Sequence, residues 1–123
     1  MSYHYDWVTR QIEILGIMLR YILTGEKTHL LQADIPDVTS ASGNELYLQL
    51  TALVRQGQIC QAENLLFDHL EEPGRQVLEA AVWFYEDLSR FSDETLYLAN
   101  FSREEILEGM QYVCRVFGLP ITE

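Results

Sequence analysis

The 123-residue chain is poor in cysteine, proline and basic residues, and each shortage excludes a class of protein. Two cysteines are too few for a disulfide scaffold, and neither stands in a CxxC motif or near a histidine at metal-ligand spacing. Three prolines in a chain that is 48% apolar argue against disorder. We therefore predict one packed domain, residues 1–123, that needs no metal or disulfide to fold.

Basic residues number 8 against 19 acidic residues, which gives a formal net charge of −11. No two basic residues are adjacent, so the chain offers no basic stripe to a phosphate backbone, and we expect no nucleic-acid partner. An anionic membrane surface would repel the chain, so we expect no membrane partner either. The acidity either keeps a small protein in solution or presents an acidic face to a basic partner.

Long apolar runs and targeting signals are missing as well. The first 25 residues lack a basic leader and carry four charged side chains, which is not the pattern of a signal peptide. The longest uncharged apolar run there, residues 14–19, is far too short to cross a bilayer. We therefore predict a cytoplasmic protein in which Cys60 and Cys114 are buried free thiols.

Catalytic and cofactor motifs are absent from the sequence. It contains no glycine-rich phosphate loop, no nucleophile elbow and no HExxH. Glu26 and His29 have the Glu-x-x-His spacing of di-iron bundles, but such sites need two of these motifs and the chain has one. The carboxylate pair Glu86-Asp87 falls on a predicted polar face, where a general acid with a raised pKa is not expected, and Glu79 is expected on the same polar side of its helix. We expect no cofactor, no metal and no enzyme.

Apolar residues recur with helical spacing along most of the chain, and β-branched residues nowhere alternate with period two. This pattern predicts an all-α bundle of five to six helices with an antiparallel hairpin at its centre. The expected helices cover residues 5–23, 44–56, 58–70, 74–90, a short segment from 92 to 100, and 102–117.

Capping residues mark several of the predicted helix ends. Gly25 is expected to end the first helix in the left-handed conformation, and the segment from there to residue 43 shows no helical period. Ser42 or Asn44 is expected to cap the second helix. Ser102 and Glu105 have the spacing of a capping box and open the last helix.

The first helix is apolar on more than one face. One stripe continues at steps of three and four and is the expected core face: Tyr5, Val8, Ile12, Leu15, Leu19 and Ile22. A second apolar set, Trp7, Ile14, Met18 and Tyr21, lies on a neighbouring face. A helix with this pattern either lies centrally in the bundle or docks one face on a partner or a second copy. We predict that the second set is the contact.

The segment from Leu46 to Leu70 predicts two short helices folded back on each other. Gly57 would end the first helix, and the small Ala62 would lie where the two helices cross. With Ile59 and Leu66 at the matching positions, this hairpin resembles a single tetratricopeptide-type repeat. The resemblance implies a helical hairpin typical of interaction scaffolds. No second copy follows one repeat length further on.

The whole chain resembles a family of short bacterial proteins filed as a domain of unknown function. The resemblance is carried by three segments and one glycine: residues 5–8 with 11–13, residues 57–67, residues 101–106, and Gly109. It implies a helical fold and brings no activity, substrate or cofactor.

From these patterns we predict a non-enzymatic interaction or structural protein that self-associates through its first helix. It would form a homo-oligomer or bind another protein. The alternative is a small-molecule-binding protein, or an enzyme whose residues converge only in the fold. Its pocket would lie between the hairpin and the fourth helix and would be lined by the aromatic residues Tyr47, Trp83 and Tyr85.

Overall fold

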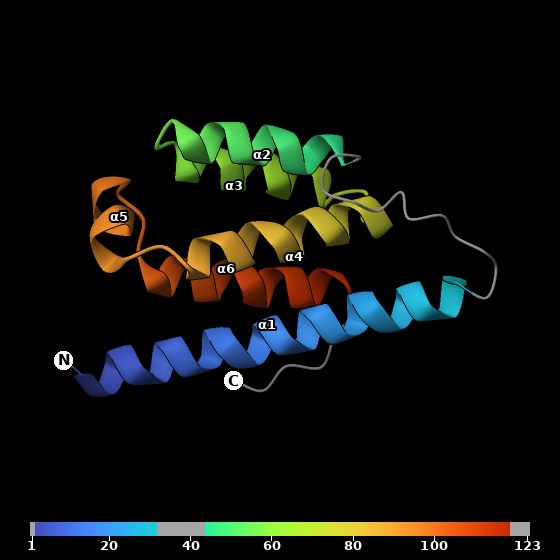
Figure 1. Cartoon of the computed structure of the whole chain (residues 1–123), viewed down its shortest axis with the longest axis horizontal. Helices are drawn as coiled ribbons and strands as arrows, with labels where there is room; N and C mark the ends of the chain where they lie inside the picture. Colours follow the sequence, from blue (N-terminus) through green and yellow to red (C-terminus); the bar gives the residue numbers. More distant parts are fainter. Residues whose placement is uncertain (1, 32–43, 119–123) are drawn as a thin grey trace.

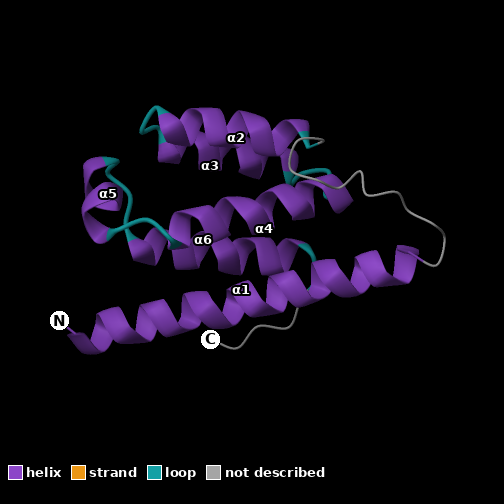
Figure 2. Ribbon diagram, viewed as in Figure 1, coloured by secondary structure: helices purple, strands orange, loops and turns teal. Residues whose placement is uncertain are grey.

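The computed structural model describes residues 2–31 and 44–118, with side chains from 6 to 23 and from 44 to 118. These residues form six helices and, within the same ranges, no strand (Figures 1 and 2). The prediction of an all-α fold is confirmed. In chain order the helices are α1 (Ser2–Leu31), α2 (Glu45–Arg55), α3 (Ile59–His69), α4 (Arg75–Ser89), α5 (Asp93–Leu98) and α6 (Arg103–Val116).

The helices pack in three layers (Figure 1). The middle layer is α4 with α6, the α2–α3 hairpin covers one side of it, and α1 covers the other. The short α5 closes one end of the hairpin side. Since α4 contacts α1, α2, α3 and α6, it takes the central position that the sequence analysis gave to the hairpin. The hairpin itself is an outer layer.

The first helix is longer than expected and does not stop at Gly25. It continues through this glycine to Leu31. One glycine inside a helix costs about 1 kcal/mol relative to alanine, and the helix formers Glu26 and Lys27 follow at once. Of the irregular segment expected between residues 25 and 43, residues 32–43 lie outside the described part of the chain. Because α1 is an outer layer, the alternative that placed it centrally in the bundle is wrong.

The hairpin has the expected start and turn. The Tyr47 N–H donates to Oδ1 of Asn44 over 3.0 Å, so Asn44 caps α2. After α2, Gly57 adopts φ +76°, which favours glycine. The Gly57 N–H donates to the Val54 carbonyl over 2.9 Å and the Gln58 N–H donates to the Leu53 carbonyl over 3.0 Å. This is the Schellman arrangement that ends a helix and reverses the chain.

The predicted capping box opens α6. The Glu105 N–H donates to Ser102 Oγ over 3.1 Å, and the Ser102 N–H donates to Glu105 Oε1 over 2.8 Å. Two backbone donors of the first turn are thereby satisfied, and the carboxylate lies at the positive end of the helix dipole. The prediction for this helix start is confirmed.

Two burial predictions need correction, and the first concerns the cysteines. Cys114 is buried as expected, and burial raises its thiol pKa to about 11. Cys60, however, is exposed. It lies in the first turn of α3 beside Ile59, one position outside the buried stripe that continues through Ala62 and Leu66.

The second correction concerns Glu79, which was expected on the polar side of α4. It is only 2% exposed. Asn44 Nδ2 donates to Glu79 Oε1 over 3.4 Å, and Arg75 Nε donates to Glu79 Oε2 over 3.3 Å. These polar partners offset the cost of removing a carboxylate from water. They tie the start of α4 to the start of α2.

Candidate interaction surface

The two faces of α1 have opposite environments. The core face contributes five buried side chains: Val8, Ile12, Leu15, Leu19 and Leu23. The opposite face carries four large apolar side chains that remain exposed, which we call the outer row: Trp7 at 51%, Ile14 at 43%, Ile17 at 69% and Tyr21 at 74%. Residues 7, 14 and 21 are seven apart, and residue 17 lies between the last two. This is the a/d spacing of a helix that packs along another helix.

The structure places three of the four predicted contact residues in this row. Trp7, Ile14 and Tyr21 are exposed, whereas Met18 is partly buried against the core. Ile17 takes the remaining place and was missed by the sequence analysis. The signal was present, because Ile17 lies three residues after Ile14 and four before Tyr21.

The length of α1 explains why this face stays uncovered. The helix has 30 residues, whereas α4 has 15 and α6 has 14. At a rise of 1.5 Å per residue, α1 is about 45 Å long and its supports are about 22 Å long. It runs past α6 at both ends, and no described helix lies on its outer side (Figure 1).

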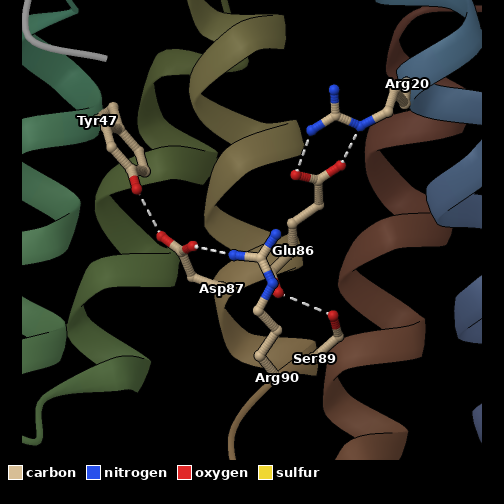
Figure 3. A network of polar contacts seen from close by, with 6 residues as sticks. All are labelled: Arg20, Tyr47, Glu86, Asp87, Ser89 and Arg90. Carbon is tan, nitrogen blue, oxygen red and sulfur yellow. Dashed lines mark hydrogen bonds and ion pairs between the residues drawn. The ribbon is translucent and has the colours of Figure 1, made fainter.

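Charged residues flank the outer row. Asp6, Glu13 and Arg20 are exposed and seven residues apart, so they follow one edge of the row, and Arg10 lies within it. Arg20 also holds α1 to α4, because its Nε and Nη2 donate to the two carboxylate oxygens of Glu86 over 2.6 Å each (Figure 3). The hydrogen bond with Glu86 raises the pKa of Arg20.

Consecutive carboxylates on α4 reach the two outer layers (Figure 3). Glu86 pairs with Arg20 of α1, as above. Asp87 turns toward the hairpin and accepts a hydrogen bond of 2.6 Å from the Tyr47 hydroxyl and one of 3.4 Å from Arg90. Burial, followed by this bond to Asp87, raises the pKa of Tyr47. Each acid has a partner on a neighbouring element, so the pair joins layers together.

A groove runs beside the outer row, between α1, α4 and α6. Its volume is about 450 Å³. Gly16 and Ile17 form part of the α1 wall, and Met110 of α6 lies opposite. A Cβ on Gly16 would lie 3.7 Å from Met110 Cε, which is ordinary contact distance. Since Ile17 borders the groove and also belongs to the outer row, the two features form one continuous surface.

The residues of the alternative pocket separate into two places. Tyr47 and Trp83 pack edge to face, with ring centroids 5.3 Å apart and planes at 72°. Tyr85 is buried elsewhere, and its hydroxyl donates to Glu63 over 2.6 Å. A cavity of about 370 Å³ does lie between α2 and α4, but Tyr47, Trp83 and Tyr85 are not among its lining residues. The cavity is lined by Thr51, Val54, Arg55, Phe84, Asp87, Arg90 and Phe91.

Three helices meet closely where Glu63 of α3, Tyr85 of α4 and Gly109 of α6 come together. A Cβ on Gly109 would overlap the Tyr85 hydroxyl and the Glu63 carboxylate, and it would lie 2.7 Å from Tyr85 Cζ. Burial raises the pKa of Glu63; Glu105 and Glu108 raise it further, and the Tyr85 bond lowers it. Glycine inside a helix is costly unless a neighbour needs the space, and that was the available signal for this position.

The described part of the chain has neither a cluster of metal ligands nor a membrane-spanning helix. No group of three or more histidine, cysteine, aspartate or glutamate side chains there could hold a metal ion. The side chains of Glu26 and His29 lie outside the described residues. None of the helices in the described ranges combines the length and hydropathy that crossing a bilayer requires.

The geometry defines a small all-α protein with a central helix pair, a tightly docked hairpin on one side and a long, half-covered helix on the other. The chain belongs to a family of unknown function (DUF6483), whose model matches residues 2–118. The predicted family resemblance is thereby confirmed. Comparison with curated proteins and with solved structures gives no match, so the likeness of the hairpin to a tetratricopeptide repeat stays a prediction.

Proposed function

We propose that this chain is a cytoplasmic protein–protein interaction or structural protein, without catalytic activity, that binds its partner through the outer row of α1. The observation that carries the proposal is this row of four exposed apolar side chains on one face of a helix. An apolar patch of this kind on an acidic protein marks a contact site, because leaving it in water gives no stability.

The composition of the row supports the same function. Two of its four members, Trp7 and Tyr21, are aromatic, and aromatic side chains dominate the energetics of protein contacts. Charges border the row at Asp6, Glu13 and Arg20, as a polar rim borders an apolar centre. The row is carried by a regular helix rather than a loop, so its spacing is preorganised for a partner helix.

The test is a matched pair of variants. Ile14→Glu/Ile17→Glu places two charges in the outer row, and Tyr97→Glu/Leu98→Glu places two charges on α5, where the side chains are 81% and 75% exposed. Native mass spectrometry of the purified proteins at tens of micromolar reports the mass of each assembly. We expect the wild type and the α5 variant to form assemblies and the α1 variant to be a monomer. Three monomeric proteins without a bound protein would overturn the proposal.

A second candidate function is small-molecule binding, either as such or as part of an enzyme, in the cavity of about 370 Å³ between α2 and α4. Its lining combines the apolar side chains of Phe84 and Phe91 with the polar side chains of Asp87 and Arg90. Val54→Trp would fill it. A small molecule retained by the wild type in native mass spectrometry and lost from this variant would favour the candidate, and a wild type free of ligand would count against it.

A further inference from the structure

We propose that the partner is a second copy of this chain and that two α1 helices pack antiparallel, with a two-fold axis near Ile14. This inference rests on the proposed function of the outer row. It adds the identity of the partner and the direction in which the two helices run.

The spacing of the row favours a two-fold axis at its middle. Trp7 and Tyr21 are each seven residues from Ile14, so reversing the helix about Ile14 exchanges them. In the antiparallel pair, Trp7 of each copy meets Tyr21 of the other, and the two Ile14 side chains meet on the axis. Both aromatic residues are at least half exposed, and the exposed part of each ring faces away from the core.

The charges favour the antiparallel direction. In a parallel pair, Arg10 would face Arg10 of the second copy within the apolar seam, since equivalent residues meet there. In the antiparallel pair, Asp6 lies about 12 Å from the axis and Arg20 about 9 Å from it, both on the same edge of the row. Asp6 therefore comes close to Arg20 of the second copy, and the dimer contains this pair twice.

The remaining charges of the row, those of Arg20, Glu13 and Arg10, are compatible with the antiparallel pair. Arg20 already binds Glu86, whose carboxylate stays beside it when Asp6 of the second copy approaches. The two Glu13 side chains face each other across the axis, and Arg10 of each copy lies about one helical turn away. The antiparallel pair thus has two opposite-charge contacts and one like-charge contact at its edge, whereas the parallel pair has a like-charge contact at its apolar centre.

The exposed area sets the expected strength. A fully covered aromatic side chain buries about 150–250 Å², so covering the exposed parts of the four row residues removes on the order of 500 Å² per copy. The total of roughly 1,000 Å² is at the lower end for a specific contact. The groove beside Ile17 adds to it if side chains of the second copy enter. We expect a dissociation constant in the micromolar range.

Disulfide crosslinking measures the direction. In a Cys60→Ser background, which removes the exposed thiol, Trp7→Cys and Tyr21→Cys are oxidised separately and as an equal mixture at about 100 µM protein. We expect crosslinked dimers that contain one chain of each variant, and at least fivefold fewer crosslinks from either variant alone. Efficient crosslinking of each variant with itself would show a parallel pair and overturn the inference.

Ile14→Cys in the Cys60→Ser background distinguishes a failure of this inference from a failure of the proposed function. Ile14 lies near the axis in either direction, so this variant crosslinks with itself whenever two outer rows meet. If it gives no dimer while native mass spectrometry shows the wild type bound to another protein through the row, the second copy is wrong and the proposed function stands. If no assembly forms at all, both are wrong.

A charge reversal in the chain with both native cysteines tests the direction of the two helices a second time. Asp6→Arg places like charges near Arg20 of the second copy, and we expect the dissociation constant to rise about fivefold at low salt and less at high salt. Glu72→Arg changes the net charge equally at an exposed turn after α3 and serves as the control. Equal effects of the two variants would overturn the antiparallel arrangement.

Discussion

The two outer layers of this protein cover the same central helix pair and differ in what they present to solvent. Of the large apolar side chains on the hairpin, Leu48 of α2 is exposed and those on its inner side are buried. On α1, four are exposed in one row. The hairpin is an outer layer that buries most of its large apolar side chains, wholly or in part, within the fold, so it presents little apolar surface to a partner. The long helix is covered on one face only, and its other face is suited to a partner.

The packing around α6 also differs between its hairpin side and its α1 side, in whether one added methyl group fits. On the hairpin side, Gly109 of α6 has no room for a Cβ beside Tyr85 and Glu63. On the α1 side, Gly16 faces Met110 with room for one. Two glycine-to-alanine substitutions therefore compare the two layers directly.

The largest effect is expected from Gly109→Ala. The new methyl group would overlap the Tyr85 hydroxyl and break its hydrogen bond with Glu63, which we expect to lower the free energy of unfolding by about 3 kcal/mol. Gly16→Ala is the matched control. It removes a flexible residue from a helix without a clash and should raise the free energy of unfolding by about 0.5 kcal/mol. Chemical denaturation measures both, and equal effects would contradict the difference in packing.

The second-largest loss of stability is expected when the hydrogen bond between the hairpin and α4 is removed. Tyr47→Phe deletes the hydroxyl that donates to Asp87 over 2.6 Å and leaves the ring against Trp83. We expect a loss of about 1 kcal/mol, because the bond joins a half-buried hydroxyl to a charged acceptor. Thermal unfolding at neutral pH checks this value. A melting temperature equal to that of the wild type would show that the hydroxyl contributes nothing to hairpin docking.

Breaking the ion pair between α1 and α4 should lower the free energy of unfolding by less. Arg20→Gln breaks two bonds of 2.6 Å to Glu86, yet the Arg20 side chain is 54% exposed. Solvent and salt weaken such pairs, so we expect a loss of about 0.5 kcal/mol. The exposed Arg10 of the same helix, changed to Gln, is the control. Measured at 1 µM protein, a loss well above that of Tyr47→Phe would reverse the proposed order of the two layers.

The smallest effect concerns pH. Burial raises the folded-state pKa of Glu63 above its ordinary value of 4.5, so its contribution to stability is full below that value and is lost as the pH rises through the folded pKa. Glu63→Gln keeps an acceptor for Tyr85 and removes the titration. We expect the variant to gain stability relative to the wild type between pH 4.5 and pH 7. A constant difference over this range would mean that the carboxyl is not desolvated.

Much of the architecture could be predicted from the sequence, because local signals decide it. The spacing of apolar residues gave the helices, and the Ser102–Glu105 capping box and Gly57 marked two of their ends. The end of α1 was missed, since one glycine is a weak stop when helix formers follow it. The burial of Glu79 could not be predicted, because it depends on Asn44, which is 35 residues away in the chain and adjacent only in the fold.

The candidate surface was predicted for the same reason and only in part. Periodicity predicted that α1 carries a second apolar face, and three of the four residues expected there, Trp7, Ile14 and Tyr21, are exposed in the structure. Met18 is partly buried and Ile17 is exposed, which spacing alone could not predict, because it does not tell which edge of the face turns toward the neighbouring helix. The closeness of Gly109 to Tyr85 and Glu63 is a contact among three helices. A glycine inside a predicted helix was the available signal for it, but the sequence could not tell which side chains on the other two helices need the space.

Sedimentation velocity of the wild-type chain from 1 to 200 µM addresses the role of the outer row most directly. We predict a concentration-dependent shift from a 14.3 kDa monomer to a dimer, with its midpoint in the micromolar range. A single monomeric species over the whole range would show that the exposed face of α1 does not bind a second copy of this protein.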